Sequence, residues 1–267
     1  MRLIVRRDYE DLSLWAARYV AGRIRNRGPA PAGPFVLGLP TGSTPLGLYQ
    51  ELIRLHREEG LSFAPVVTFN MDEYRGLGPD HPRSFRYFMQ KHFFDHIDLR
   101  PENIHFLSGL CPDEEAECAA YEEQIRLAGG IELFLGGAGE DGHLAFNEPY
   151  SSLSSRTRLK TLTQGTRQAN ARFFEGDLSQ VPRTALTVGI GTILDAREVL
   201  IAASGQAKAE AVRQGVEGPV SHRCPLSALQ LHPRAALLCD RDAAARLAPE
   251  TLDYFSQISA PCQPFSI

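Results

Sequence analysis

The clearest indication of the fold class is the stretch Phe35-Val-Leu-Gly-Leu-Pro-Thr-Gly-Ser-Thr-Pro-Leu-Gly-Leu-Tyr-Gln-Glu51. It begins with an almost continuously apolar run, passes through a glycine turn, and continues with apolar residues at helical spacing. Apolar strands of this kind are expected where helices cover both faces of a parallel sheet. The stretch therefore predicts a strand, a tight turn and a helix, which is the repeating unit of α/β folds.

The same alternation of short apolar runs and amphipathic segments continues along the chain. Further strands are predicted at residues 65–69, 131–135, 185–188, 198–202 and 235–239, and helices at residues 8–26, 45–59, 113–127 and 206–214. We expect an α/β fold: a doubly wound, mostly parallel, Rossmann-like sheet with helices on both faces, in a single domain that spans residues 1–267. The proline-rich segment 27–34 comes too early to join two domains, so it is predicted to be a loop.

Composition argues against several classes of function. Of the 267 residues, 43% are hydrophobic and 22% are charged, and the net charge of -4 offers no basic surface for nucleic acid. No apolar run approaches the roughly eighteen residues that cross a membrane. The 5 cysteines show no paired spacing, which argues against a disulfide framework or a thiolate zinc site, and the N-terminus lacks a signal-peptide pattern. We therefore expect a cytoplasmic protein.

Residues that follow the strands are the candidates for function, because ligands of open α/β sheets bind beyond the carboxyl ends of the strands. After the first core strand, Gly42 permits a tight turn, and Ser43 and Thr44 supply hydroxyl groups before the helix, whose first position suits Pro45. Backbone N–H groups at such a helix start attract anions. The spacing is typical of a phosphate cradle, and an ordinary capped turn is an equal alternative.

Two adjacent acids, Asp72 and Glu73, follow the next strand. A carboxylate at this edge can act as a general base if partial burial raises its pKa above the value of about 3.9 for a free Asp. The two side chains are expected to point in different directions, so at most one reaches a given substrate atom. An acid that merely stabilises the start of a helix is the alternative.

The segment Gly136-Gly-Ala-Gly-Glu-Asp-Gly-His-Leu-Ala-Phe-Asn-Glu148 lets the backbone approach a ligand closely, because 4 of its first 7 residues are glycine. Asp141 and Glu148 are predicted to surround His143 with two carboxylates, which suit it to proton transfer near neutral pH. A histidine without a catalytic role and a structural Glu148 are the alternatives. The segment lacks the G-x-G-x-x-G opening of a dinucleotide site, and its ligand set is too small for a clear metal site. We expect neither a cofactor nor a metal.

Two cations are further candidates for ligand binding. Lys208 begins the helix after the predicted strand 198–202, beside a glycine turn, where an ammonium group suits a phosphate dianion. Arg172 is ambiguous from the residues alone. An exposed side chain is the alternative for both.

Taken together, the motifs resemble those of glucosamine-6-phosphate deaminases over nearly the whole chain. They are Leu39-Pro-Thr-Gly-Ser-Thr-Pro45, Phe69-Asn-Met-Asp-Glu-Tyr74, Gly139-Glu-Asp-Gly-His-Leu-Ala-Phe-Asn-Glu-Pro149, Ser154-Ser-Arg-Thr-Arg-Leu-Lys-Thr-Leu162, Ala185-Leu-Thr-Val-Gly-Ile-Gly-Thr192 and Ser227-Ala-Leu-Gln-Leu-His-Pro233. The resemblance implies a modified doubly wound fold and the conversion of glucosamine 6-phosphate and water into fructose 6-phosphate and ammonia. It also implies a homohexamer, the usual assembly of the longer bacterial members.

The resemblance further implies roles for single residues. Asp72 matches the base that moves a proton between C2 and C1 of the sugar. His143 matches the acid–base group that opens the pyranose ring, assisted by Asp141 and Glu148. The residues matched to phosphate are Ser43, Thr44 and Lys208, beside the turn at Gly42, and the residue matched to sugar hydroxyls is Arg172.

A second, regulatory site is implied for N-acetylglucosamine 6-phosphate, an activator that raises substrate affinity. The matching residues are Met1, Ser151, Ser152, Arg158, Lys160, Thr161 and Tyr254. If residues 158–162 form a strand, Arg158 and Lys160 project from one face and can meet one phosphate. A solvated basic edge is the alternative from the residues alone.

Two other functions stay open. A 6-phosphogluconolactonase is similar in fold and in its Gly-rich Asp-Gly-His loop, but it needs no base at C2, and this chain retains the Asp72 motif and continues as Leu144-Ala-Phe-Asn-Glu148. A non-catalytic sugar-phosphate sensor would normally carry a DNA-reading module, for which we see no spare segment. At one position the chain departs from the resemblance, which implies a small residue after Glu148-Pro149 where this sequence has Tyr150.

Overall fold

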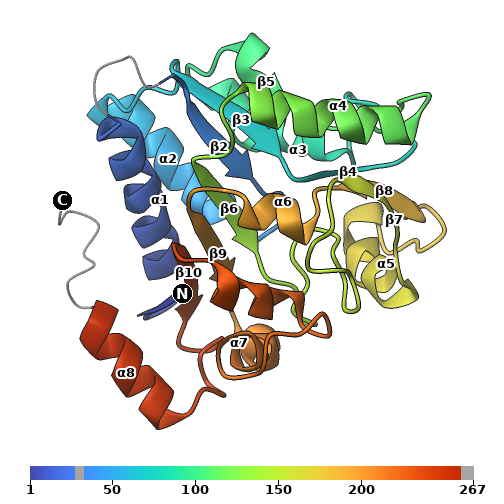
Figure 1. The fold of residues 1–267 in the computed structure, drawn as a ribbon. Helices are drawn as coiled ribbons and strands as arrows, with labels where there is room; N and C mark the ends of the chain where they lie inside the picture. The colour runs from blue at the N-terminus through green and yellow to red at the C-terminus, as the bar shows by residue number, and fades with distance from the viewer. Residues whose placement is uncertain (28–32, 260–267) are drawn as a thin grey trace.

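The computed structural model describes residues 1–27 and 33–259 and confirms the doubly wound sheet (Figure 1). Within these residues, a 7-stranded sheet is parallel throughout. Its order is β1 (Arg2–Arg6), β10 (Ala235–Asp240), β9 (Val199–Ala203), β6 (Leu133–Gly137), β2 (Phe35–Leu39), β3 (Val66–Asn70) and β5 (Ile104–His105). Most of the predicted loop 27–34 and Cys262 lie outside the described residues.

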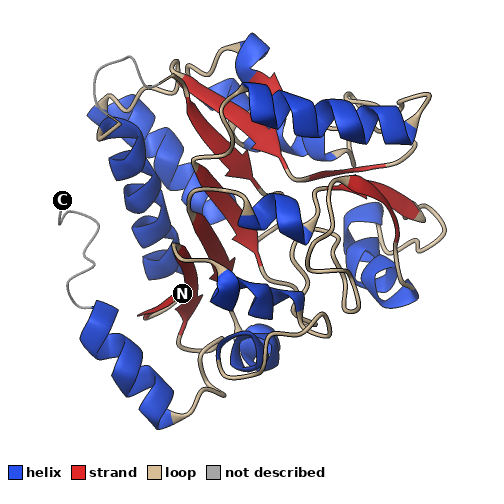
Figure 2. Ribbon diagram, in the orientation of Figure 1, coloured by secondary structure: helices blue, strands red, loops and turns tan. Residues whose placement is uncertain are grey.

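Helices cover both faces of this sheet (Figure 2). On one face, α1 (Tyr9–Arg25), α2 (Leu46–Glu59) and α3 (Phe85–His92) share a core with the sheet. On the other face lie α4 (Glu114–Leu127), α6 (Ile190–Leu194) and α7 (Ala209–Val216). Three predicted helices are confirmed, and Asp8 and Asp113 cap two of them by accepting a backbone N–H. The fourth begins as the 3-10 turn η4 (Gln206–Lys208) before α7.

A second sheet corrects one prediction. The strand expected at 185–188 is β8 (Thr184–Thr187), but it lies outside the parallel sheet, between β4 (Asp72–Tyr74) and β7 (Arg158–Thr161), and pairs antiparallel with both. An apolar run predicts a buried strand without saying which sheet buries it. A separate small core lies against this second sheet, with Tyr74, Phe146 and Phe174 among its members.

The remaining elements connect or flank these layers. They are α5 (Gln164–Asn170), α8 (Pro249–Ser259), η1 (Phe94–His96), η2 (Pro101–Asn103), η3 (Ala171–Phe174) and η5 (Pro225–Leu231). α8 packs beside β1, at the edge of the main sheet that lies away from β7 (Figure 1). Among the described residues, every helix is too short or too polar to cross a bilayer.

Candidate active site

The loops after β9, β6, β2 and β3 meet at one edge of the main sheet, because these strands are neighbours and run parallel (Figure 1). From β2 the chain continues to β3 on one side, whereas β6 and β9 lie on the other side. Such a reversal of strand order opens a crevice between the two central loops. A Cβ atom built on Gly137, at the end of β6, would lie 4.0 Å from the Cβ of Thr44, after β2. The candidate site therefore lies between β2 and β6.

His143 and Asp141 form a close pair in the loop after β6. Nδ1 of His143 lies 2.6 Å from Oδ1 of Asp141, which also accepts the backbone N–H of His143 at 3.1 Å. Burial acts to raise the pKa of the Asp141 carboxyl, but the hydrogen bond and charge of His143 outweigh burial and leave this pKa below its usual value. Because an ionised Asp141 only accepts hydrogen bonds, Nδ1 carries a proton and Nε2 is left for a substrate.

Gly139 makes room for this imidazole ring. A Cβ atom at position 139 would lie 2.2 Å from Nδ1 and Cε1 of His143, so a larger residue would displace the ring. Gly142 adopts a φ of 81°, a conformation that residues other than glycine rarely adopt, and forms the turn between Asp141 and His143. The glycines of this loop therefore determine where the imidazole lies.

Glu148, predicted as the second carboxylate around His143, makes its hydrogen bonds with the start of α5. Its Oε1 accepts the backbone N–H of Thr163 at 3.0 Å and the hydroxyl groups of Thr163 and Thr166. Thr163 is the N-cap of α5, and a Thr before a helical segment is the signal that sequence reasoning missed. Within the described residues, the Glu148 side chain is thus bonded to the start of α5 and not to the imidazole of His143, and it connects the His143 loop to α5.

Asp72 is a buried carboxyl group, and its Oδ1 has no hydrogen-bond partner among the described residues. Burial raises its pKa well above the usual value, and the nearby charge of Glu73 raises it further. Asp72 follows β3, as predicted, and it begins a further strand, β4, with only Met71 between β3 and β4. A buried carboxyl group with a raised pKa suits proton abstraction near neutral pH.

Glu73, by contrast, is engaged by the start of α3. Its two carboxylate oxygens accept the backbone N–H groups of Phe85 and Arg86, both at 3.0 Å, and of Tyr74 at 2.9 Å. Burial raises the pKa of Glu73 to about 7, and these three hydrogen bonds oppose that rise. Of the two adjacent acids, Glu73 stabilises a helix start, whereas Oδ1 of Asp72 stays unpaired in the part of the chain that the structure describes.

Hydrogen bonds join the strand of Asp72 to the loop of His143. Asp72 pairs across the small sheet with Thr187, whose hydroxyl oxygen accepts the backbone N–H of Phe146 at 3.1 Å. The side chain of Asn147 donates at 2.7 Å to the carbonyl of the residue after Thr187. The carboxyl group and the imidazole therefore come from different sheets that are connected directly beside the site.

The loop of Gly42, Ser43 and Thr44 lies directly before α2, and its backbone N–H groups are candidates for anion binding. None of these three N–H groups has an acceptor among residues 1–27 and 33–259. Gly42 adopts a φ of 102°, as the predicted tight turn requires. Successive free N–H groups in a turn before a helix form a concave site for an anion.

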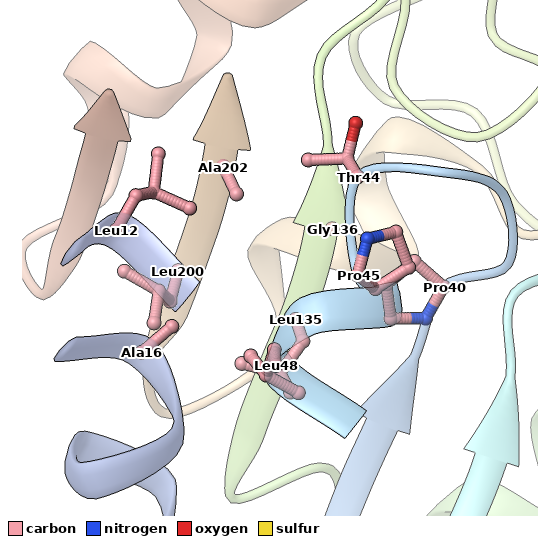
Figure 3. A pocket seen from close by; sticks show the side chains of 10 residues that line it. All are labelled: Leu12, Ala16, Pro40, Thr44, Pro45, Leu48, Leu135, Gly136, Leu200 and Ala202. Carbon is pink, nitrogen blue, oxygen red and sulfur yellow. The ribbon is translucent and has the colours of Figure 1, made fainter. Parts of the chain in front are cut away.

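An apolar cavity lies behind this loop, between α1, α2 and the sheet (Figure 3). It is lined by Leu12, Ala16, Pro40, Thr44, Pro45, Leu48, Leu135, Gly136, Leu200 and Ala202. The hydroxyl group of Thr44 points away from the leucine side chains in this view. A lining with so few polar groups does not suit a sugar phosphate, so the cavity adjoins the candidate site at Thr44 but is not itself the sugar-phosphate pocket.

Lys208 and Arg172 bring positive charge to the same edge. Burial lowers the pKa of the Lys208 ammonium group, with opposing effects from the charges of Glu140 and Asp141 and a further lowering by Arg172. Arg172 is exposed in η3, and its guanidinium carbon lies 4.8 Å from the centre of the Phe173 ring. The charges of Arg172 and Asp141 both act on Lys208, so residues predicted for phosphate binding and for proton transfer share one neighbourhood.

The residues predicted for a regulatory site fall into two groups. β7 confirms the predicted strand, and Arg158 and Lys160 are its half-buried residues, so they project from one face. Ser151, Ser152 and Thr161 belong to the same part of the chain, whereas Met1 and Tyr254 lie by β1 and α8 at the opposite edge (Figure 1). Within one chain the two groups do not meet.

Comparison with known proteins is consistent with this geometry. Residues 7–238 match the family described as glucosamine-6-phosphate isomerases/6-phosphogluconolactonase. A glucosamine-6-phosphate deaminase of Treponema denticola is 60% identical over 97% of this chain and 96% of its own length. A glucosamine-6-phosphate deaminase of Porphyromonas gingivalis is 56% identical over 97% of this chain and 98% of its own.

Solved structures give the same result. A monomeric glucosamine-6-phosphate deaminase superposes with a TM-score of 0.88 at 46% identity, over 92% of this chain and 99% of that one. A 6-phosphogluconolactonase from Trypanosoma cruzi has a TM-score of 0.71 at 20% identity, over 92% of this chain and 97% of that one, which is a likeness of fold alone. The chain belongs to the family of glucosamine-6-phosphate isomerases and 6-phosphogluconolactonases, among its glucosamine-6-phosphate deaminases.

Proposed function

We propose that this chain converts glucosamine 6-phosphate and water into fructose 6-phosphate and ammonia, a step of amino sugar breakdown. The observation that carries the proposal is the presence of two separate proton-transfer groups at one crevice. Asp72 is buried and His143 is held by Asp141, and among residues 1–27 and 33–259 the Oδ1 atom of Asp72 and the Nε2 atom of His143 have no hydrogen-bond partner. Isomerisation with deamination needs one group for the ring oxygen and another for the carbon-bound proton, so this pair suits the reaction.

The reaction divides between these groups. His143 moves a proton between the anomeric hydroxyl and the ring oxygen, which opens the pyranose ring. Asp72 then removes the proton from C2 to form an enolamine and returns it to C1. Water adds to the resulting iminium carbon, and ammonia leaves. Glu148 acts on this chemistry through the His143 loop and α5, and no step requires a redox partner.

The phosphate group binds the free N–H groups of Gly42, Ser43 and Thr44, with the ammonium group of Lys208 as counter-charge. Arg172 contacts the sugar hydroxyls from the exposed η3 turn. These contacts hold the sugar so that C2 faces Asp72 and the ring oxygen faces His143. The phosphate-binding residues therefore hold one end of the substrate, and the proton-transfer residues act at C2 and at the ring oxygen.

The deciding experiment incubates the protein with glucosamine 6-phosphate and measures ammonia and fructose 6-phosphate together. Equal amounts of both products are expected. A lactonase would instead hydrolyse 6-phosphogluconolactone and release no ammonia, and a sensor would bind the sugar phosphate without turnover. Absence of both products would remove the proposal.

Replacing Lys208 by alanine is expected to weaken substrate binding by roughly 1.5 to 3 kcal/mol, because a charge-assisted hydrogen bond to the phosphate is lost. Isothermal calorimetry with glucosamine 6-phosphate in the Asp72→Asn background measures this loss without turnover. Lys91→Ala, at an exposed lysine of α3, is the matched control and should bind as the parent does. Equal affinities of the Lys208 and Lys91 variants would contradict the role of Lys208.

The regulatory site is a further part of the proposal. Arg158 and Lys160 would receive the phosphate of N-acetylglucosamine 6-phosphate, with Ser151, Ser152 and Thr161 near them on the same chain. Met1 and Tyr254 would have to come from a neighbouring chain, so this site requires an oligomer, for which a homohexamer is proposed. The similar structure described as monomeric makes a single-chain enzyme the alternative, and light scattering distinguishes the two.

That the chain forms a single domain and works in the cytoplasm is proposed from the sequence alone.

With such a site, substrate saturation curves are expected to be sigmoidal and to become hyperbolic with activator. The activator should tighten substrate binding by a factor of about 5 to 100, the usual range of allosteric coupling. Lys160→Ala should remain sigmoidal at the same activator concentration, whereas Lys91→Ala should respond like the parent protein. Curves that are hyperbolic without activator and indifferent to it would contradict the regulatory site.

A further inference from the structure

Tyr9, the first residue of α1, reaches across to the loop that follows β2. Its hydroxyl oxygen lies 3.1 Å from the carbonyl oxygens of both Ser43 and Thr44, and the two carbonyls share its proton. The same hydroxyl oxygen accepts the backbone N–H of Gly47 at 2.9 Å. One side chain thus holds three successive parts of the loop and of the start of α2.

α2 lacks a cap of its own. The residue at its N-cap position is Pro45, which makes no side-chain capping hydrogen bond, although the sequence predicted Pro45 at the first helical position. The first N–H groups of a helix need partners from outside the helix. Because Tyr9 accepts the N–H of Gly47, it supplies from α1 the cap that the local sequence lacks.

The packing of α1 on α2 keeps Tyr9 in this place. A Cβ atom on Gly47 would lie 2.5 Å from Oγ and 2.9 Å from Cβ of Ser13, and 3.1 Å from the hydroxyl of Tyr9. Only a glycine fits at position 47 without moving one of the two helices. The first turn of α2 and the first turns of α1 therefore form one rigid contact.

The hydrogen bond of Tyr9 to the Ser43 carbonyl, together with the one that this carbonyl accepts from the Leu46 N–H at 3.3 Å, sets the direction of the Thr44 N–H group. In a planar trans peptide the C=O and the N–H point in opposite directions. When the carbonyl of Ser43 faces Tyr9, the N–H of Thr44 faces away from it. That N–H has no acceptor within the described residues, so it is available to an anion.

We propose that Tyr9 is a positioning residue for phosphate recognition: its hydroxyl orients the Ser43–Thr44 peptide so that the Thr44 N–H faces the phosphate. Tyr9 does not touch the substrate itself, and it acts through the loop. The inference rests on the proposed function, in which this loop binds the phosphate of an amino sugar phosphate. The inference gives α1, which covers one face of the main sheet, a role in substrate affinity.

The test is Tyr9→Phe, which removes the hydroxyl and keeps the ring. The KM for glucosamine 6-phosphate and the dissociation constant of inorganic phosphate should both rise about 3- to 10-fold, the usual effect of one lost hydrogen bond, while kcat stays within about twofold. Tyr19→Phe is the matched control, because Tyr19 lies on the same helix but donates to Glu198. Glu198 directly precedes β9, at the amino ends of the strands, whereas the candidate site lies at their carboxyl ends. The KM and phosphate affinity of Tyr19→Phe should equal those of the parent.

A second variant, Gly47→Ala, should raise the same two constants by displacing the Gly47 N–H from Tyr9. Unchanged constants in Tyr9→Phe would overturn the inference. So would an equal loss in Tyr9→Phe and Tyr19→Phe, since that result reflects a weakened α1 and not the loop. If the parent protein releases no ammonia, the proposed function fails, and calorimetry with inorganic phosphate still decides the role of Tyr9.

Discussion

Replacement of Asp72 by asparagine is expected to abolish exchange of the C2 proton of glucosamine 6-phosphate with solvent and to lower kcat by about 10²- to 10⁴-fold. An amide of the same size cannot accept that proton. The Asp72 oxygen Oδ1 has no hydrogen bond to lose within the described residues, so the fold and the substrate affinity should change little. Deuterium incorporation at C2, followed by NMR in D₂O, measures the exchange, and calorimetry measures the affinity.

Glu73→Gln is the control for this variant, because it makes the same chemical change at the adjacent buried position. Glu73 binds the start of α3, so its variant should lose stability and retain C2 exchange. The pH profile adds an independent check. Burial raises the pKa of Asp72, so kcat/KM should fall as the pH drops through that raised value and Asp72 becomes protonated. Exchange at the parental rate in Asp72→Asn would identify another residue as the base.

Replacement of His143 by glutamine is the second large effect, and it should fall on ring opening. We expect about a 10²-fold or greater loss of kcat with the cyclic substrate, because glutamine cannot relay a proton between the anomeric hydroxyl and the ring oxygen. A substrate analogue that is already in the open-chain form should be affected much less. The comparison of kcat/KM for the two forms separates ring opening from the chemistry at C2.

His81→Gln provides the matched control for His143, since His81 is an exposed histidine that accepts the backbone N–H of Arg83 outside the candidate site. Its activity with both forms of the substrate should equal that of the parent. Equal losses for the cyclic and open-chain forms in His143→Gln would assign His143 to a step after ring opening.

Strand prediction succeeded where burial on both faces leaves a continuous apolar run. β2, β3, β6, β9 and β10 are of this kind. β1 was missed, because arginines begin and end its five residues and it pairs at the edge of the sheet. The three-residue β4 is too short for any period to be recognised, and its partner β8 lies more than a hundred residues away, so pairing alone defines it.

The site was predicted from the kinds of residue that follow the strands, and its individual partners were not. Spacing placed Asp141 next to His143, because a two-residue separation across a glycine turn leaves little choice. The sequence allows Glu148 to bond either to His143 or to Thr163, and it bonds to Thr163 because α5 packs beside it. The bond of Tyr9 to Thr44 joins residues 35 positions apart, and no local pattern announces such a contact.

The placement of Asp72 in β4 and of His143 in the loop after β6 has a mechanical consequence. Asp72 is held by its pairing with Thr187, and the His143 loop is held by the hydrogen bond from the Phe146 N–H to Thr187, so the contact at Thr187 influences the distance between base and acid. A displacement near 1 Å is enough to change a rate by about 10²-fold. A change at the contact between Thr187 and Phe146 is therefore expected to alter turnover without altering Asp72 or His143 themselves.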